Sequence, residues 1–172
     1  MVSAQNAPNL ILQVRTRIPA GLPPRDILAG RIVEVFRMVI DRSKLYIPDR
    51  DIELGVTLTD DNDIRVINKA HRQTDAPTDV LSFPMFSDGL VKNANETAGD
   101  SPVALGDIVI SLETLTCQAS DRALPVHERF AECLVHGMLH IMGFEHSSES
   151  GRIDIEALED DLVPHASGIL AP

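Results

Sequence analysis

The chain has 172 residues, of which 44% are hydrophobic and 24% charged, so it can bury a core without disulfide or metal staples, and we expect one domain over residues 1–172. No apolar run approaches the ~20 residues of a membrane span, and the first residues lack the basic and apolar regions of a signal peptide. We therefore expect a cytoplasmic protein that does not bind membranes.

The formal net charge of −11 argues against a polyanionic partner, but the charges are unevenly distributed. Residues 1–92 hold 12 basic and 12 acidic residues, whereas residues 93–172 hold 3 and 14. A local basic face in the first half could bind RNA while the acidic remainder suppresses nonspecific binding; alternatively, the charge only makes the surface soluble. With no Trp, one Tyr and five Phe, a broad aromatic platform for RNA bases is not expected.

The first half of the chain alternates between predicted strands and helices. Residues 9–16 have the composition of a short strand, and apolar residues at helical spacing predict a helix over 25–42. The alternation in 51–58 predicts a second strand. Asp60 or Asp61 is the expected N-cap of a helix near 62–72.

The second half continues this pattern up to an acidic helix. Strands are predicted over 78–84 and 104–111, on either side of a polar, Gly- and Asn-rich loop at 87–102. The helices predicted after them span 112–123, the segment from Pro125 to about Met142, and about 149–163. The class is α+β or α/β, with a small mixed sheet and about five helices in one core.

Three histidines in the segment HGMLHIMGFEH (136–146) have the spacing of metal ligands. His136 and His140 are four residues apart, so a helix projects both from one face. Gly143 can end that helix and let the chain return His146 as a third ligand. Three His leave a fourth tetrahedral position open, which is typical of a catalytic zinc site, and we expect one zinc per chain.

The same spacing occurs in the metzincin zinc peptidases, but their catalytic machinery is missing here. The Glu that follows their first His and acts as the general base is replaced by Gly137. No Met follows Met142, so the Met-turn of those enzymes cannot form. A peptidase is therefore the weakest of the hypotheses that follow.

Two further segments, NKAHRQTDAPTDVLSFP (68–84) and GDIVIS (106–111), complete a resemblance over roughly residues 9–163. With the histidine segment, they resemble the YbeY family of metal-dependent bacterial endoribonucleases. The resemblance implies an α+β fold, zinc at the three His, and cleavage of single-stranded RNA rather than DNA. It also implies a role at the 3′ end of small-subunit rRNA and in ribosome quality control, with small-subunit ribosomal proteins and a ribosome-assembly GTPase as partners.

The resemblance further implies that Arg72 is the functionally important arginine of the family. Beside a zinc bound through His136, its guanidinium would neutralise charge that develops on a phosphoryl group, so we expect Arg72 and His136 to be catalytic. The chain departs from the family at His71, where an aromatic residue is common, and at Glu145, where Asp is common. The loop at 87–102 is longer than in some members, and it is interpreted as either a gate or a passive surface loop.

Several polar residues near these motifs keep more than one interpretation. Arg65, Lys69 and Arg72 recur at helical spacing, either as a basic stripe that follows the RNA backbone or as a solvated outer face. Glu145 orients a ligand, acts as a base, or is a surface carboxylate. Asp107 lies in an apolar strand and contacts either a partner or an arginine. The short polar residues after Arg72 orient its side chain or cap the turn around Pro77; they are Asp75, Thr78, Asp79 and Ser82.

The leading hypothesis is a zinc-dependent endoribonuclease of ribosome maturation, with a metzincin-like three-His site in an α+β domain. The alternative is a ribosome-assembly factor whose metal site is mainly structural, and the nucleophile, water or the 2′-OH, is left open. Cys117 and Cys133 lack the spacing of a metal-binding pair, so we expect reduced thiols in the core.

Overall fold

The computed structural model of the chain describes residues 9–43, 51–86, 102–144 and 149–172, with residues 149–154 described by their helical backbone alone. The predicted loop at 87–102 falls almost entirely outside these ranges, and so do Glu145 and His146. The fold below is that of the described residues.

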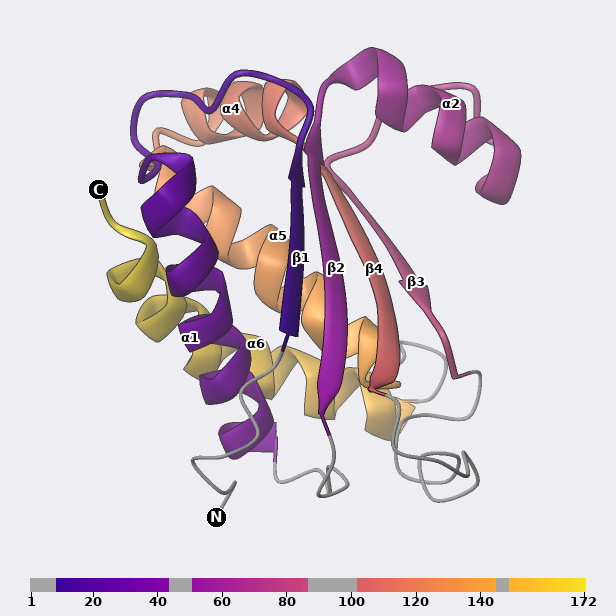
Figure 1. Ribbon diagram of the computed structural model, residues 1–172, viewed down its shortest axis with the longest axis vertical. Coiled ribbons are helices and arrows are strands. Elements are labelled where there is room, and N and C mark those ends of the chain that lie inside the picture. The colour runs from indigo at the N-terminus through magenta and orange to yellow at the C-terminus, as the bar shows by residue number, and fades with distance from the viewer. Residues whose placement is uncertain (1–8, 44–50, 87–101, 145–148) are drawn as a thin grey trace.

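Four strands form one mixed sheet in the order β1-β2-β4-β3 (Figure 1). They are β1 (Asn9–Val14), β2 (Ile52–Thr59), β3 (Val80–Pro84) and β4 (Val103–Ser111). Strands β1, β2 and β4 are parallel, and β3 pairs antiparallel with β4 at the edge of the sheet. Each predicted strand is confirmed, and the sheet is mixed, as expected.

Five helices lie among the described residues: α1 (Arg25–Ser43), α2 (Asp61–Arg72), α4 (Leu112–Asp121), α5 (Val126–Ile141) and α6 (Glu149–Leu170). In Figure 1, α1, α5 and α6 lie on one side of the sheet, and α2 and α4 lie where β2 and β4 end. Within the described ranges, no helix combines the length and apolar content that crossing a bilayer requires. The α+β class with about five helices is confirmed.

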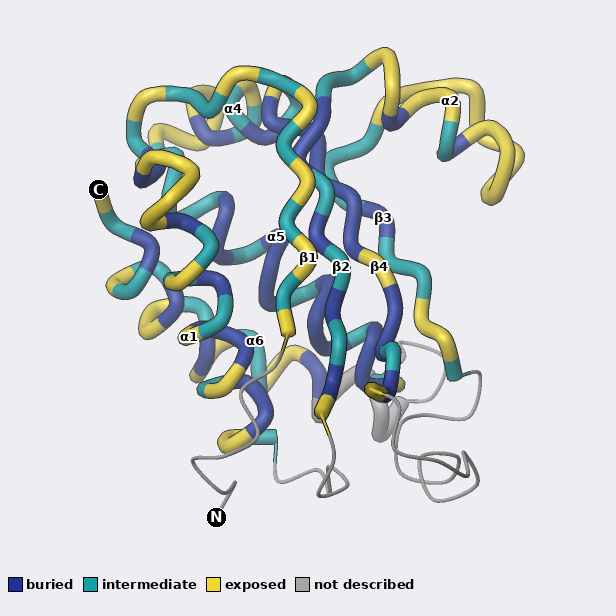
Figure 2. The backbone as a smooth tube through the Cα atoms, viewed as in Figure 1, coloured by how far each residue is buried: buried dark blue, intermediate teal, exposed yellow. Residues whose placement is uncertain are grey.

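The core lies between the sheet and the layer of helices. Along β2, every second side chain is buried, from Ile52 to Leu58, while those between, such as Glu53 and Thr57, remain partly exposed (Figure 2). This alternation follows from the two-residue period of a strand with one face on the core. A smaller apolar cluster of Ile64, Leu81 and Val109 fastens α2 to the other face of the sheet.

The predicted end of the last helix, residue 163, is wrong. The helix continues to Leu170 with Pro164 inside it. A proline within a helix removes one backbone hydrogen bond and clashes with the carbonyl four residues earlier, which is why a stop was expected. Leu162, Ala166 and Leu170 are all buried in the main core, so packing stabilises the turns that follow Pro164.

Hydrogen bonds at the start of α2 tie it to two other elements. Of the two candidates, Asp60 is the N-cap, and its carboxylate accepts from the backbone N–H of Asp63 at 3.0 Å. The Asp61 carboxylate accepts from Ser111 Oγ at 2.5 Å and from Thr114 Oγ1 at 2.6 Å, where β4 passes into α4. Burial alone would raise the pKa of Asp61, but these hydrogen bonds outweigh it and lower that pKa below 3.8.

Candidate functional site

Helix α5 places His136 and His140 on one face, as their spacing predicts. Their Nε2 atoms are 3.1 Å apart, and the rings meet edge to face with centroids separated by 4.4 Å. Both side chains are only partly exposed. The third predicted ligand, His146, lies outside the described residues, and within the described ranges no group of three potential ligands forms a metal site. The pair is therefore established, and the three-His site stays a prediction.

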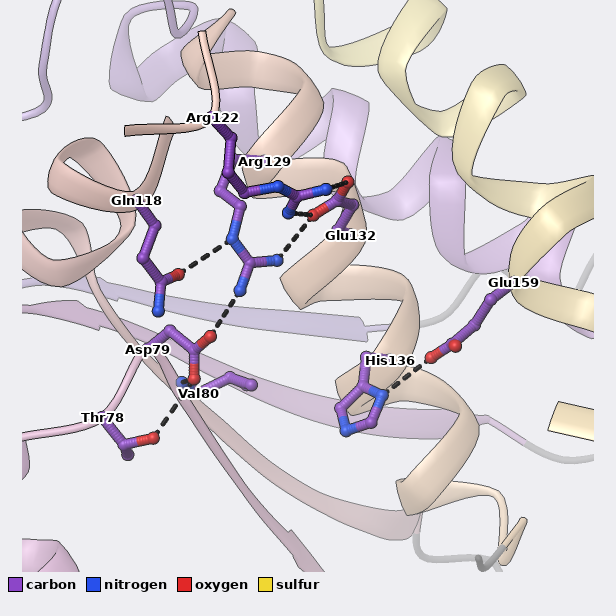
Figure 3. A network of polar contacts seen from close by, with 9 residues as sticks. All are labelled: Thr78, Asp79, Val80, Gln118, Arg122, Arg129, Glu132, His136 and Glu159. Carbon is purple, nitrogen blue, oxygen red and sulfur yellow. Dashed lines mark hydrogen bonds and ion pairs between the residues drawn. The ribbon is translucent and has the colours of Figure 1, made fainter. Parts of the chain in front are cut away.

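A carboxylate from α6, which the sequence reasoning missed, contacts this pair. Glu159 Oε1 lies 2.7 Å from Nδ1 of His136 (Figure 3). The acidic segment after residue 148 holds several carboxylates, and none is distinguished by its sequence alone. The local signal is that Glu159 lies one residue after Leu158 and four after Ile155, at the border of the face that packs on the core.

His136 and Glu159 line a cavity of about 480 Å³ between α5, α6 and the start of β3. Other charged groups on its wall are Asp79, Arg129, Glu132 and Asp160. Carboxylates therefore outnumber basic side chains there, and such a cavity favours a cation and repels a phosphate unless a cation is present.

Gly137, next to the first histidine, lets α5 pack closely on the sheet. A Cβ atom at this position would lie 2.9 Å from Cγ2 of Ile108 and 3.3 Å from Oγ of Ser82. Ile108 is fully buried in β4. The residue that replaces the peptidase glutamate thus packs on the core, and any side chain there would have to shift Ile108.

A chain of ion pairs forms the wall of the cavity on the β3 side. The Arg129 guanidinium bridges Asp79, Glu132 at 2.8 Å and the side chain of Gln118 at 2.9 Å, and Arg122 adds a second pair to Glu132 (Figure 3). Only 13% of the Arg129 side chain is exposed. This arginine is already satisfied by its partners and serves to hold α5 against β3 and α4.

Asp79 has a structural role in this chain of ion pairs. Burial alone would raise its pKa, but the backbone N–H of Val80, the Arg129 charge and the Thr78 hydroxyl outweigh burial and lower that pKa. The Asp79 carboxylate accepts from the Val80 N–H at 2.8 Å and pairs with Arg129, not with Arg72, and its predicted capping of the turn around Pro77 stays a prediction.

The buried thiol of Cys133 also lines the cavity, only 1% exposed. Burial raises the pKa of this thiol to about 12, so it is neutral and unreactive in the folded protein. Both cysteines are free, as predicted, but only Cys133 is a core thiol; the prediction was wrong for Cys117, which is exposed.

Arg72 lies at the end of α2, exposed, and is not among the residues that line the cavity. Its Nη2 donates to the backbone carbonyl of Ser82 at 3.4 Å. Ser82 in turn packs against α5 at Gly137. The edge strand β3 therefore lies between the arginine and the helix that carries the histidines, and the role of Arg72 stays a prediction.

The basic stripe on α2 is exposed but partly neutralised. The Asp75 carboxylate accepts from Arg65 Nε at 2.7 Å and from Lys69 Nζ at 2.8 Å. These two bonds lower the pKa of Asp75 to about 2. Asp75 thus pairs with the first two members of the stripe, and its contacts among the described residues include none with Arg72, whose side chain it was expected to orient.

Asp107 is exposed on the face of the sheet opposite the main helix layer. Its carboxylate lies over Gly55 of β2, where an added Cβ would be only 2.0 Å from Asp107 Oδ1. Among the described residues, no arginine forms an ion pair with Asp107, so contact with a partner is the interpretation that stays a prediction. Glu145 lies outside the described ranges.

Comparisons with known proteins agree on one family. The sequence profile described as "Endoribonuclease YbeY" matches residues 25–167. A relative from Sinorhizobium fredii with the same description is 38% identical over 146 residues, which span 82% of this chain and 80% of the relative. Another, from Rhizorhabdus wittichii, is 36% identical over 108 residues, which span 63% of this chain and 62% of that relative.

A solved structure has the same fold. The solution structure of TM1509 from Thermotoga maritima is similar with a TM-score of 0.59, over 92% of this chain and 90% of that protein. The two sequences are 18% identical, so this likeness supports the fold alone.

Proposed function

The chain belongs to the YbeY family of endoribonucleases, and from this premise we propose that it is a zinc-dependent endoribonuclease that cleaves single-stranded RNA. The proposed unit is a single domain over residues 1–172, acting in the cytoplasm with one zinc on His136, His140 and His146. Arg72 and His136 are the proposed catalytic residues.

The observation that carries this proposal is the geometry of the histidine pair. Two nitrogens that share one tetrahedral zinc at ~2.0–2.1 Å lie roughly 3.3 Å apart. The Nε2 atoms of His136 and His140 are 3.1 Å apart, and His136 lies on the wall of a cavity rich in carboxylates. The residues present therefore fit a zinc ion with little movement of α5.

The protein's own residues then have separable tasks. Zinc, when bound, supplies a Lewis acid beside the scissile phosphate. The exposed guanidinium of Arg72 offers two parallel N–H donors to phosphate oxygens, which a lysine cannot match. The exposed Arg65 and Lys69 lie on the same helix and extend the positive surface along which an RNA backbone can bind.

The substrate we propose is rRNA, cleaved near the 3′ end of the small-subunit molecule, with a further role in ribosome quality control. Small-subunit ribosomal proteins and a ribosome-assembly GTPase are the proposed partners. These assignments follow from the family, and the exposed α2 is the surface of the described chain that best suits such a polyanion.

A zinc peptidase is disfavoured by the contacts of Gly137. A glutamate there would need to displace the buried Ile108, so the general base of those enzymes has no place beside the first histidine. The other alternative, an assembly factor with a structural metal site, makes the same zinc contacts and differs only in catalysis.

One experiment separates these alternatives. Zinc content, melting temperature and cleavage of single-stranded RNA are measured for wild type and His136→Ala, each with and without a chelator. We expect about one zinc per wild-type chain and RNA cleavage that both the chelator and the substitution abolish. Zinc binding without any cleavage supports the assembly factor, and full cleavage by zinc-free protein rules out the metal mechanism.

A further inference from the structure

The carboxylate of Glu159 connects the C-terminal helix to the first histidine of the site. The side chains of His136 and Glu159 are 35% and 26% exposed, and their Nδ1 and Oε1 atoms are 2.7 Å apart (Figure 3). A charge-assisted hydrogen bond of this length on a partly buried ring restricts how that ring turns.

The direction of this bond determines which ring nitrogen is left for a metal. An ionised carboxylate can only accept, so the contact favours a proton on Nδ1 of His136 and leaves Nε2 as the ring atom that can bind a metal. Nε2 is also the atom that lies 3.1 Å from Nε2 of His140. Glu159 therefore favours the tautomer in which the nitrogen of His136 that faces His140 is the one suited to a metal ion.

The packing of α6 explains why this glutamate reaches the ring. Ile155, Leu162 and Ala166 recur at helical spacing and are fully buried in the main core. This apolar stripe fixes the rotation of α6 against the core, and Glu159, at the edge of the stripe, lies on the border with α5. The position of the carboxylate is thus set by apolar contacts on both sides of it in the sequence.

We propose that Glu159 is a positioning residue of the metal site, which holds the orientation and the tautomer of His136 and makes α6 part of that site. The inference rests on the proposed metal-binding role of His136. Carboxylates that hold a ligating histidine typically contribute 10–100-fold to metal affinity. A purely structural contact between α5 and α6 would change stability and leave zinc affinity unaltered.

The test compares Glu159→Ala, Glu159→Gln and the matched control Asp160→Asn. Asp160 is the adjacent residue on α6 and lines the same cavity, so its substitution removes one negative charge without touching the bond to His136. Zinc affinity is measured by competition with a chromophoric chelator. The tautomer of His136 is read from the imidazole ¹⁵N shifts of the metal-free protein at mildly alkaline pH.

We expect Glu159→Ala to weaken zinc binding about 10–100-fold and to shift His136 from the Nδ1–H form toward a mixture. Glu159→Gln, whose amide oxygen still accepts, should lose less affinity. Asp160→Asn removes a charge but no bond to the ring, so it should keep the tautomer and lose far less affinity than Glu159→Ala. Melting temperatures of the metal-free variants show whether Glu159→Ala still folds. If it does not, the zinc affinity of Glu159→Gln tests the proposal.

The inference is overturned if wild type, Glu159→Gln and Glu159→Ala bind zinc with equal affinity. It is also overturned if His136 in the metal-free wild type carries its proton on Nε2. Neither the zinc affinity nor the tautomer measurement uses RNA. The proposed role of Glu159 and the proposed function can therefore be contradicted independently. Zinc binding that depends on Glu159 in a protein without RNA cleavage overturns only the proposed function. Wild-type protein that binds no zinc overturns both.

Discussion

At the scale of one residue, the close packing of Gly137 against the sheet limits which side chains can stand beside His136. We predict that Gly137→Ala destabilises the protein by about 1–3 kcal/mol, because the new methyl group would press on the buried, β-branched side chain of Ile108. Chemical denaturation gives the free energy of unfolding, and zinc affinity reports whether the adjacent His136 has moved.

The matched control is Gly30→Ala on α1. Nothing lies within 4 Å of a Cβ atom at that position. The substitution should therefore stabilise the helix by about 0.5–1 kcal/mol through the entropy of the unfolded chain. Equal effects of the two substitutions would show that the close approach of α5 to β4 has no energetic weight.

Arg72 is the residue for which catalysis and stability should separate most clearly. We predict that Arg72→Ala slows RNA cleavage by about 10²–10³-fold, the usual cost of losing one preorganised donor to developing charge. Arg72→Lys should recover part of the rate, because it restores the charge without the planar pair of donors. Single-turnover cleavage is measured on both variants.

The melting temperature should change little in these variants, because Arg72 is exposed and its hydrogen bond to the Ser82 carbonyl is long, at 3.4 Å. The competing account is a structural role in holding α2 against β3. A clear drop in melting temperature, with cleavage preserved at low temperature, would favour that account.

At the scale of elements, the Asp61 carboxylate ties α2 to the junction of β4 and α4. We predict that Asp61→Ala costs on the order of 1–3 kcal/mol at neutral pH, because the Ser111 and Thr114 hydroxyls lose their acceptor. Equilibrium denaturation of wild type and variant at several pH values measures this difference.

The difference should also depend on pH with a definite sign. The pKa of Asp61 is lowered in the folded state, so its contribution is complete above the ordinary value of 3.8 and is lost as the pH falls through the folded-state pKa. The two unfolding curves should therefore converge in strong acid. A gap that widens on acidification contradicts this role.

The elements also show how far the sequence could predict the fold. The alternation in β2 and the helical stripe in α1 are local patterns, and both were located closely. The extension of α6 past Pro164 was missed, since it depends on a core formed by other parts of the chain. The strand order could not be predicted, because pairing of β2 with β4 joins distant segments.

The residues of the candidate site likewise fall into those that a local pattern predicts and those that only the fold brings together. A four-residue spacing on one helix was enough to predict that His136 and His140 share a face. Glu159 could not be found, because an acidic helix offers many equivalent carboxylates until its packing on α5 selects one. The ion pair of Asp79 with Arg129 likewise joins two segments that only the fold brings together.

At the scale of the whole molecule, the acidic cavity and the basic stripe on α2 place opposite charges on separate parts of the surface. We predict that Asp75→Asn strengthens the binding of single-stranded RNA, because it releases Arg65 and Lys69 from their shared carboxylate. The salt dependence of binding should steepen by up to ~0.7 in log–log slope for each released cation that contacts a phosphate.

Lys69→Ala is the complementary variant and should make that slope shallower. RNA affinity is measured over a range of salt concentrations for wild type and both variants. If neither substitution changes the slope, the stripe on α2 is a solvated face and RNA binds elsewhere.

Because Cys133 is buried in the wall of the cavity, its reaction with a thiol reagent can report how often α5 separates transiently from its neighbours. In a Cys117→Ser background, the remaining thiol is 1% exposed and protonated, so an alkylating reagent can modify it only when α5 separates from its neighbours. We predict slow labelling that zinc slows further, in proportion to ligand saturation. Mass spectrometry over time would then give the frequency with which the cavity wall opens, without denaturant or RNA.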